Sequence, residues 1–270
     1  MKNTILDIAK ELVPFATNPL SLSLRNGGLT GVSLFFFYYA RFTEDKQCME
    51  LANNALERVV ANVPFFMSSH FSSDLADIGR TVELLASEDF LEAETYEFAG
   101  YFKEPLMHRL KEDAGIDFGF CTGTTGICDF FLNKADKQEA LDITFKHIYS
   151  GLKVKGYPKH PVETVFLFPS EILRDVKIFL LKLEKENIPF PQKELLYDAI
   201  RKFESKKILR SNCHEYYTFQ DLREAGLMDD KQKIRSVSEN IAANSSDLVF
   251  KGLASMSLAD NSLPAWWKLI

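Results

Sequence analysis

The chain has 270 residues, 46% of them hydrophobic, so it can bury a substantial core in one large domain or two small ones. A formal net charge of −6 and the lack of a basic run exclude the concentrated positive surface that nucleic-acid binding requires. Charged residues interrupt the apolar positions of the N-terminal stretch MKNTILDIAKELVPF, which therefore predicts neither a signal peptide nor membrane insertion. We expect a soluble, cytoplasmic protein.

A short phrase of the form small-x-x-small-aliphatic recurs along the chain. GLTGV begins at Gly28 and GTTGI at Gly123, and each opens a run of bulky apolar residues. Including copies with altered small residues, the phrase begins at positions 28, 74, 123, 172, 215 and 252. The copies at 172 and 215 are the faintest. Intervals of 37 to 49 residues are typical of a helical-pair repeat or of a propeller blade.

Amphipathic helices are predicted between these phrases. Residues 45–63, 137–152 and 192–208 place apolar side chains at three- and four-residue spacing with charge on the other face. In the last of these, the predicted apolar stripe includes Leu195 and Leu196. Each phrase is instead followed by a nearly continuous apolar stretch, such as VSLFFFYYARF, which predicts a helix buried on most faces. A strand remains an alternative for LFFFYY, although its repeat context favours a helix.

Each repeat therefore consists of a buried inner helix and a half-exposed outer helix. The predicted fold is all-α: an α/α toroid in which about six helical pairs close a ring, with residues 1–270 forming one domain. Glycine where an inner helix begins permits the close backbone approach that converging helices need. The aromatic pair Trp266 and Trp267 after the last copy also favours closure. The alternative is an open α-solenoid.

Several stretches together resemble one known family. They are GGLTGVSLFFFYYARFTEDKQCMELA, SSDLADIGRTVELLASEDFLEAETYE, GFCTGTTGICDFFLNKADKQEALD, KIFLLKLEKENI and VFKGLASMSL. These stretches resemble the lanthionine synthetase C family, the LanC-like cyclases that fold as α/α toroids. The chain is shorter than the usual member, which has seven repeats. The resemblance implies a role in peptide modification, with a precursor peptide or a modification enzyme as the partner.

The resemblance also implies a zinc site. Active members of the family hold zinc through cysteine and histidine residues just before the repeat glycine, and the metal activates a peptide thiol for addition to a dehydrated residue. Only Cys213 and His214 match a ligand pair here, and the catalytic histidine of the family falls at Glu171. Cys121 holds a similar place two repeats earlier. Zinc is thus the cofactor implied, with an incomplete ligand set, and the residues themselves point to no other cofactor.

Carboxylates lie at or next to the small-residue positions in several copies of the phrase. If the inner helices begin at the mouth of a cavity, these carboxylates form an acidic rim there that suits a cationic or hydroxylated ligand. They are Asp74, Asp77, Glu171, Asp175 and Glu215. Paired carboxylates are also what glycosidic cleavage needs. The alternative is that Asp74 and Asp77 cap the inner helices by accepting backbone N–H bonds.

Three functions follow from these observations. The first is a degenerate LanC-like protein that binds a precursor peptide or partner enzyme, with zinc-dependent thioether cyclisation left uncertain. The second is a carbohydrate-active toroid that uses the rim carboxylates, by analogy of fold. The third is a non-catalytic interaction scaffold whose own aromatic side chains fill the cavity. The chain-wide resemblance favours the first.

Overall fold

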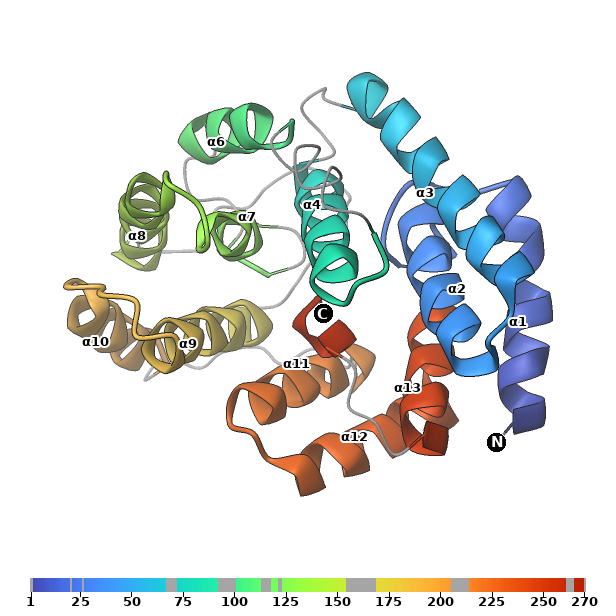
Figure 1. Cartoon of the computed structure of the whole chain (residues 1–270). Coiled ribbons are helices and arrows are strands. Elements are labelled where there is room, and N and C mark those ends of the chain that lie inside the picture. Colours follow the sequence, from blue (N-terminus) through green and yellow to red (C-terminus); the bar gives the residue numbers. More distant parts are fainter. Residues whose placement is uncertain are drawn as a thin grey trace. The chain divides into compact units, whose positions relative to one another are not determined.

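The computed structural model describes residues 2–19, 21–25, 27–66, 72–91, 101–112, 118–120, 123–153, 169–204, 214–260 and 265–269. Within these ranges the regular secondary structure is helical, which confirms the all-α prediction (Figure 1). The helices are α1 (Lys2–Thr17), α2 (Leu29–Thr43), α3 (Lys46–Phe66), α4 (Ser72–Ser87), α6 (Lys103–Glu112), α7 (Thr124–Phe131), α8 (Lys137–Lys153), α9 (Pro169–Lys185), α10 (Lys193–Glu204), α11 (His214–Leu227), α12 (Lys231–Asn244), α13 (Leu248–Asp260) and the 3₁₀ helix η1 (Ala265–Leu269). None of them has the length and apolar character needed to cross a membrane.

The six copies of the phrase coincide with the beginnings of six helices. Gly28 and Gly123 are the extended residues immediately before α2 and α7. In the other copies α4, α9, α11 and α13 begin one to four residues before the phrase. For α13 the earlier start has a visible cause, because the Asp247 side chain accepts hydrogen bonds from the N–H groups of Val249 and Phe250. The LFFFYY stretch lies within α2 and is helical.

Burial separates inner helices from outer ones, as the apolar patterns predict. Every residue of α2 from Leu29 to Ala40 is buried, and so are all eight residues of α7. The outer helices α3 and α8 instead bury one stripe and expose the opposite face. In α10 the stripe prediction is wrong at one residue: Leu196 is buried, whereas Leu195 is 49% exposed.

Four inner helices end in the same turn. Glu44, Asp89, Asn187 and Asp229 follow α2, α4, α9 and α11 with positive φ angles of 52° to 58°. In each case the next N–H donates to the carbonyl five residues earlier, as in Ile188 to Leu183 and Asp230 to Ala225. This pair of features defines a Schellman motif, in which a left-handed residue closes the last helical turn. The shared turn is independent support for the repeat.

The chain divides into two compact units. The first comprises Met1–Tyr101 and Asp221–Ile270, and the second comprises Phe102–Gln220. In the first unit α2 packs against α1, α3, α4 and α13. In the second unit α7 packs against α6, α8 and α9, and α10 packs against α8 (Figure 1). Each unit therefore has at least one almost fully buried inner helix at its centre.

Candidate functional site

The two glycine phrases fold into the same local structure. In both, a chain segment with two buried apolar residues lies across the first turn of the inner helix. The Thr30 hydroxyl donates to the Leu22 carbonyl at 2.5 Å, and the Thr125 hydroxyl donates to the Phe118 carbonyl at 2.7 Å. The repeated phrase thus fixes the segment that precedes each inner helix.

The second glycine of each phrase is required by close backbone approach. A Cβ atom on Gly31 would lie 2.1 Å from the Leu24 carbonyl oxygen, and one on Gly126 would lie 1.7 Å from the Phe120 carbonyl oxygen. No side chain fits at such distances, because backbone atoms cannot move away without breaking the turn. The phrase therefore has a structural reason in both copies.

Asp175, in the neighbouring inner helix, holds the segment that precedes α7. It lies in α9 and is 1% exposed. Its two carboxylate oxygens accept hydrogen bonds from the Phe120 N–H at 2.8 Å and from Gln220 Nε2 of α11 at 2.9 Å. This carboxylate therefore joins α9, α11 and the loop before α7 inside the second unit.

Asp77 occupies the corresponding position of α4 in the first unit. It is buried and forms an ion pair with Arg80, three residues later in the helix. Burial raises the pKa of Asp77, while the positive charges of Arg80 and then Arg25 oppose that shift. Asp77 is the sixth residue of α4, so its carboxylate lies within the helix rather than at its cap, and the capping interpretation is wrong for this residue.

The other predicted site residues are only partly described. Asp74, Glu171, His214 and Glu215 belong to α4, α9 and α11, but their side chains lie outside the described part of the structure, and so do Cys121 and Cys213. No group of three or more histidine, cysteine, aspartate or glutamate residues within the described ranges is arranged to hold a metal ion. A fit of zinc to Cys213 and His214 is therefore not shown, and the ligand pair stays a prediction.

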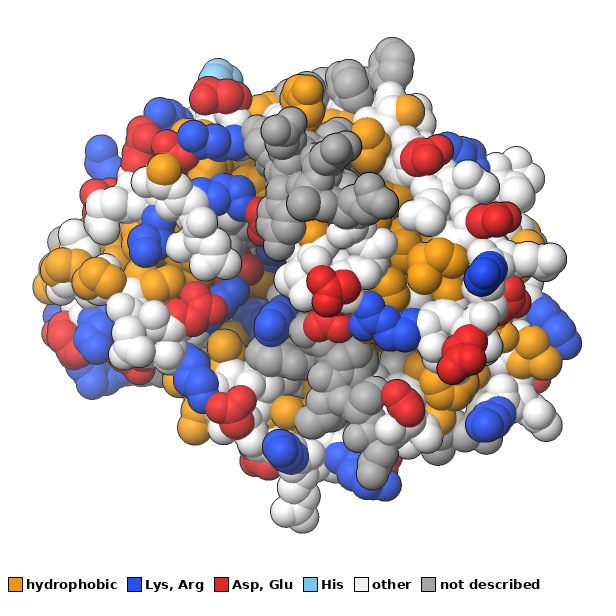
Figure 2. Space-filling view, viewed as in Figure 1, with side chains coloured by type: hydrophobic (Ala, Val, Ile, Leu, Met, Phe, Trp, Pro, Cys, Tyr) orange, Lys and Arg blue, Asp and Glu red, His pale blue; other side chains and the backbone are white. Residues whose placement is uncertain are grey.

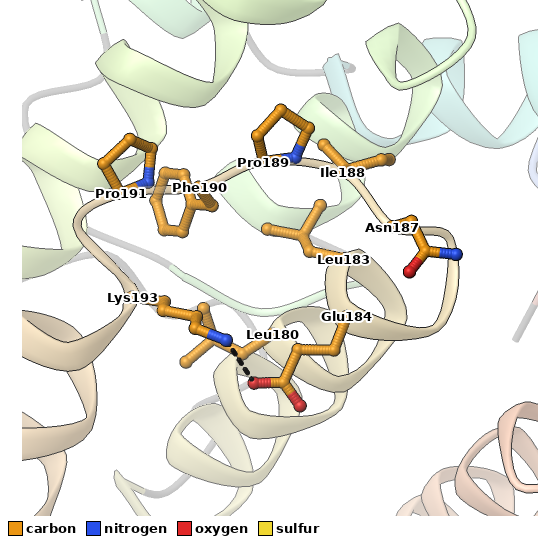
Figure 3. A pocket seen from close by; sticks show the side chains of 9 residues that line it. All are labelled: Leu180, Leu183, Glu184, Asn187, Ile188, Pro189, Phe190, Pro191 and Lys193. Atoms are coloured by element: carbon orange, nitrogen blue, oxygen red, sulfur yellow. Dashed lines mark hydrogen bonds and ion pairs between the residues drawn. The ribbon is translucent and has the colours of Figure 1, made fainter.

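A pocket lies where α9 turns back into α10 (Figure 3). Its volume is about 600 Å³, which falls in the range of small-ligand sites. The apolar part of the lining comes from Leu180 and Leu183 of α9 and from the loop Ile188–Pro189–Phe190–Pro191. At its edge Lys193 Nζ lies 3.3 Å from Glu184 Oε1. The pocket thus combines an apolar wall with one ion pair.

The loop that forms this wall is anchored from behind. Phe190 is 6% exposed, and its ring packs edge-on against Phe145 of α8 with centroids 6.0 Å apart. Phe145 in turn stacks on Tyr149. The two prolines flanking Phe190 have fixed φ angles, which further limits the loop. The pocket wall is therefore built into the second unit.

The residue that follows Asn187, the residue with positive φ, explains why the connection from α9 to α10 is longer than the turns after α2 and α11. In the turns after α2 and α11 that residue is an aspartate, Asp45 or Asp230, whose side chain accepts an N–H of the next helix, so the outer helix begins at once. After α9 the residue is Ile188, and the chain continues through Pro189 and Pro191 before α10 begins. Sequence reasoning missed this pocket, although the asparagine followed by two prolines was an available signal.

On the face shown in Figure 2, acidic and basic side chains are interspersed over the second unit, with apolar side chains between them.

No family model matches the chain, and no curated protein and no solved structure shows significant similarity to it.

Proposed function

We propose that this protein is a LanC-like binding protein of a peptide-modification pathway, which holds a precursor peptide or a partner enzyme. The resemblance of the repeated phrases supports the pathway, and the observation that carries the binding role is the apolar pocket between α9 and α10. A volume of about 600 Å³ accommodates one or two peptide side chains. The Glu184–Lys193 pair at its edge offers polar partners for the peptide backbone.

The lining of the pocket determines the kind of segment that fits. Leu180, Leu183 and Phe190 form its buried base, and the exposed apolar surface comes from Ile188 and the two prolines. An aliphatic or aromatic side chain therefore gains the most from burial there. Tyr197 Oη lies 3.5 Å from Glu184 Oε1 and adds a hydroxyl to the polar edge. A short peptide with an apolar anchor and free backbone amides matches this arrangement.

The carbohydrate alternative receives less support. Asp77 is paired with Arg80, and both carboxylate oxygens of Asp175 already accept hydrogen bonds. A carboxylate in such a role is not available to transfer a proton to a glycosidic oxygen without first losing these partners.

Peptide selection followed by binding to matched variants tests the proposal. Peptides enriched from a displayed random library are measured by calorimetry against the native protein, Ile188→Asp and Leu195→Asp. Ile188 lines the pocket, whereas Leu195 is an exposed leucine of α10 outside the lining. Ile188→Asp should weaken binding at least about tenfold, since an apolar contact is replaced by a charge, and Leu195→Asp should leave it unchanged. Equal binding to all three proteins would contradict a role of the pocket.

Metal analysis separates the binding role from cyclisation. Stoichiometric zinc in the purified native protein that is lost in Cys213→Ala would support a working cyclase site. A native protein without zinc, together with peptide binding at the pocket, would support the non-catalytic form that we propose.

A further inference from the structure

The pocket between α9 and α10 has a carboxylate at its edge that a ligand can reach (Figure 3). Glu184 Oε1 lies 3.3 Å from Lys193 Nζ and 3.5 Å from Tyr197 Oη. Glu184 Oε2 makes neither of these contacts, and the side chain is 39% exposed. The pair with Lys193 lies at the surface, where ion pairs contribute little to stability. A cation carried by a ligand can therefore replace the Lys193 ammonium or bind beside it.

The charge at this edge favours a cation over an anion. The end of α9 and the beginning of α10 meet here, so their helix dipoles oppose each other and the side chains decide the sign. Burial raises the pKa of Tyr197, and the negative charges of Glu184 and Glu194 raise it further. Lys182 of α9 is already paired with Asp129 of α7 at 2.5 Å. Carboxylates therefore dominate the charge next to the Tyr197 hydroxyl.

The carboxylate is adjacent to the apolar base of the pocket. Glu184 follows Leu180 by one helical turn, and side chains four residues apart lie on the same face of a helix. Successive residues of an extended peptide are about 3.3–3.6 Å apart. When an apolar side chain of a peptide contacts Leu180 and Ile188, a charge on the same residue or on the next one comes within reach of Glu184.

We propose that the pocket selects peptides that carry a positive charge beside their apolar anchor, and that the Glu184 carboxylate binds this charge. This inference rests on the proposed function, because a peptide has to enter the pocket. The cation is either a free N-terminal ammonium or the side chain of a lysine or arginine. Both donate charge-assisted hydrogen bonds to a carboxylate.

Four synthetic peptides that share one apolar sequence, chosen from those enriched in the displayed library, test the inference. One is blocked at both ends and uncharged, one has a free N-terminus, one is blocked and has an arginine beside the anchor, and one is blocked and has a glutamate there. Binding is measured by calorimetry to the native protein, Glu184→Gln and Glu139→Gln. Glu139 is the matched control, since it pairs with Lys111 in the same unit, is half-exposed and lies outside the pocket lining.

The native protein should bind at least one cationic peptide about three- to fivefold more tightly than the uncharged one, which is the effect of an exposed ion pair. The peptide that gains affinity identifies the source of the charge. The preference should be lost in Glu184→Gln, kept in Glu139→Gln, and reduced as the salt concentration rises.

The inference is overturned, with the proposed function intact, if the uncharged peptide binds the native protein as tightly as both cationic peptides do. Retention of the preference in Glu184→Gln would have the same consequence. Tighter binding of the glutamate peptide would also overturn it and would assign the recognition to Lys193. No binding of any peptide would overturn the proposed function as well.

Discussion

Single atoms decide the structure of the repeated phrase. At Gly31 and Gly126 the missing side chain allows a carbonyl oxygen to approach the helix, while the threonine one position earlier donates to a second carbonyl of the same segment. Glycine and threonine therefore act together: the glycine leaves space for one carbonyl, and the threonine hydroxyl donates a hydrogen bond to another. Both copies have the same pairing of these roles.

Replacing the second glycine should be costly for this reason. Gly126→Ala places a methyl group against the Phe120 carbonyl, and we expect a loss of at least about 2 kcal/mol in the free energy of unfolding, measured by urea denaturation. Ser255 holds the corresponding position in the last copy and already carries a side chain. Ser255→Ala should cost less than about 1 kcal/mol, and an equal loss in both variants would contradict the backbone-contact explanation.

The two described cysteines should differ in reactivity. Burial raises the pKa of Cys128 to about 12, and burial together with Asp45 raises the pKa of Cys48 to about 11. At pH 8 the thiolate is therefore about one part in a thousand at Cys48, and it rises about tenfold per pH unit up to its pKa. Cys128 is fully buried, so its alkylation also requires opening of the unit.

Peptide mapping after iodoacetamide treatment should find Cys48 modified before Cys128, and increasingly fast from pH 8 to pH 10. Cys128 should become modified at a comparable rate only in denaturant. Modification of native Cys128 as fast as Cys48 would contradict the burial.

The roles of Asp77 and Asp175 show the limit of prediction at the level of residues. Both are charged at the fourth position of the phrase, which other copies fill with a small residue, and that much is visible in the sequence. Their partners differ in this respect: Arg80 is the only lysine or arginine between Arg58 and Lys103 and lies three residues after Asp77, whereas the Phe120 N–H is 55 positions from Asp175 and has no signal in the sequence. A rim prediction needs the direction of each side chain, which spacing alone does not provide.

At the scale of elements, the Asp175 carboxylate of α9 links its helix by hydrogen bonds to α11 and to the segment before α7. Replacing it by asparagine keeps the shape but sets an amide donor where the carboxylate now accepts from Phe120 or Gln220. Asp175→Asn should therefore lower stability by about 1–3 kcal/mol. Hydrogen exchange of the Phe120 amide should also become at least about tenfold faster.

Asp198→Asn is the matched control, since Asp198 pairs with Arg201 on the exposed face of α10. Surface pairs contribute little, so its effect should stay within about 0.5 kcal/mol. Unchanged exchange at Phe120 in Asp175→Asn would show that the carboxylate does not hold the loop.

The helices were predictable because their apolar periodicity is set by burial. The stripe of α3 and the continuous apolar run of α2 both appear in the structure as buried surface. Leu195 shows why single positions fail: periodicity gives the stripe but not its width. The pocket after α9 was missed because it depends on a loop, where Ile188 and two prolines replace the capping aspartate of the shorter turns.

At the scale of the whole molecule, the first unit is discontinuous in sequence. Its N-terminal helices α1 and α2 pack against α13 near the other end of the chain. Gly252 marks this contact, because a Cβ atom there would lie 2.3 Å from the Phe35 ring and 3.1 Å from Ile8 Cγ2. Closure of the repeats into a ring remains a prediction, as does the open solenoid.

Enlarging Gly252 should therefore destabilise helices more than 200 residues away in sequence. Gly252→Leu forces α13 away from Phe35 and Ile8, so amide exchange should accelerate in residues 5–16 and 29–40 while residues 169–204 of the second unit stay protected. Met228→Leu, at a side chain that is 61% exposed, should change neither region. Faster exchange confined to α13 would contradict cooperative packing in this unit.

Because the first unit is discontinuous, it can complete its folding only after the second unit has been synthesised. All of the second unit leaves the ribosome before α13 exists, whereas α2 waits for about 200 further residues. At 5–20 residues per second, that delay is about 10–40 s. During this interval the phenylalanine-rich face of α2 that later packs against α13 is exposed. The new chain therefore reaches its final structure only if aggregation is slow during the delay or if a chaperone binds that face.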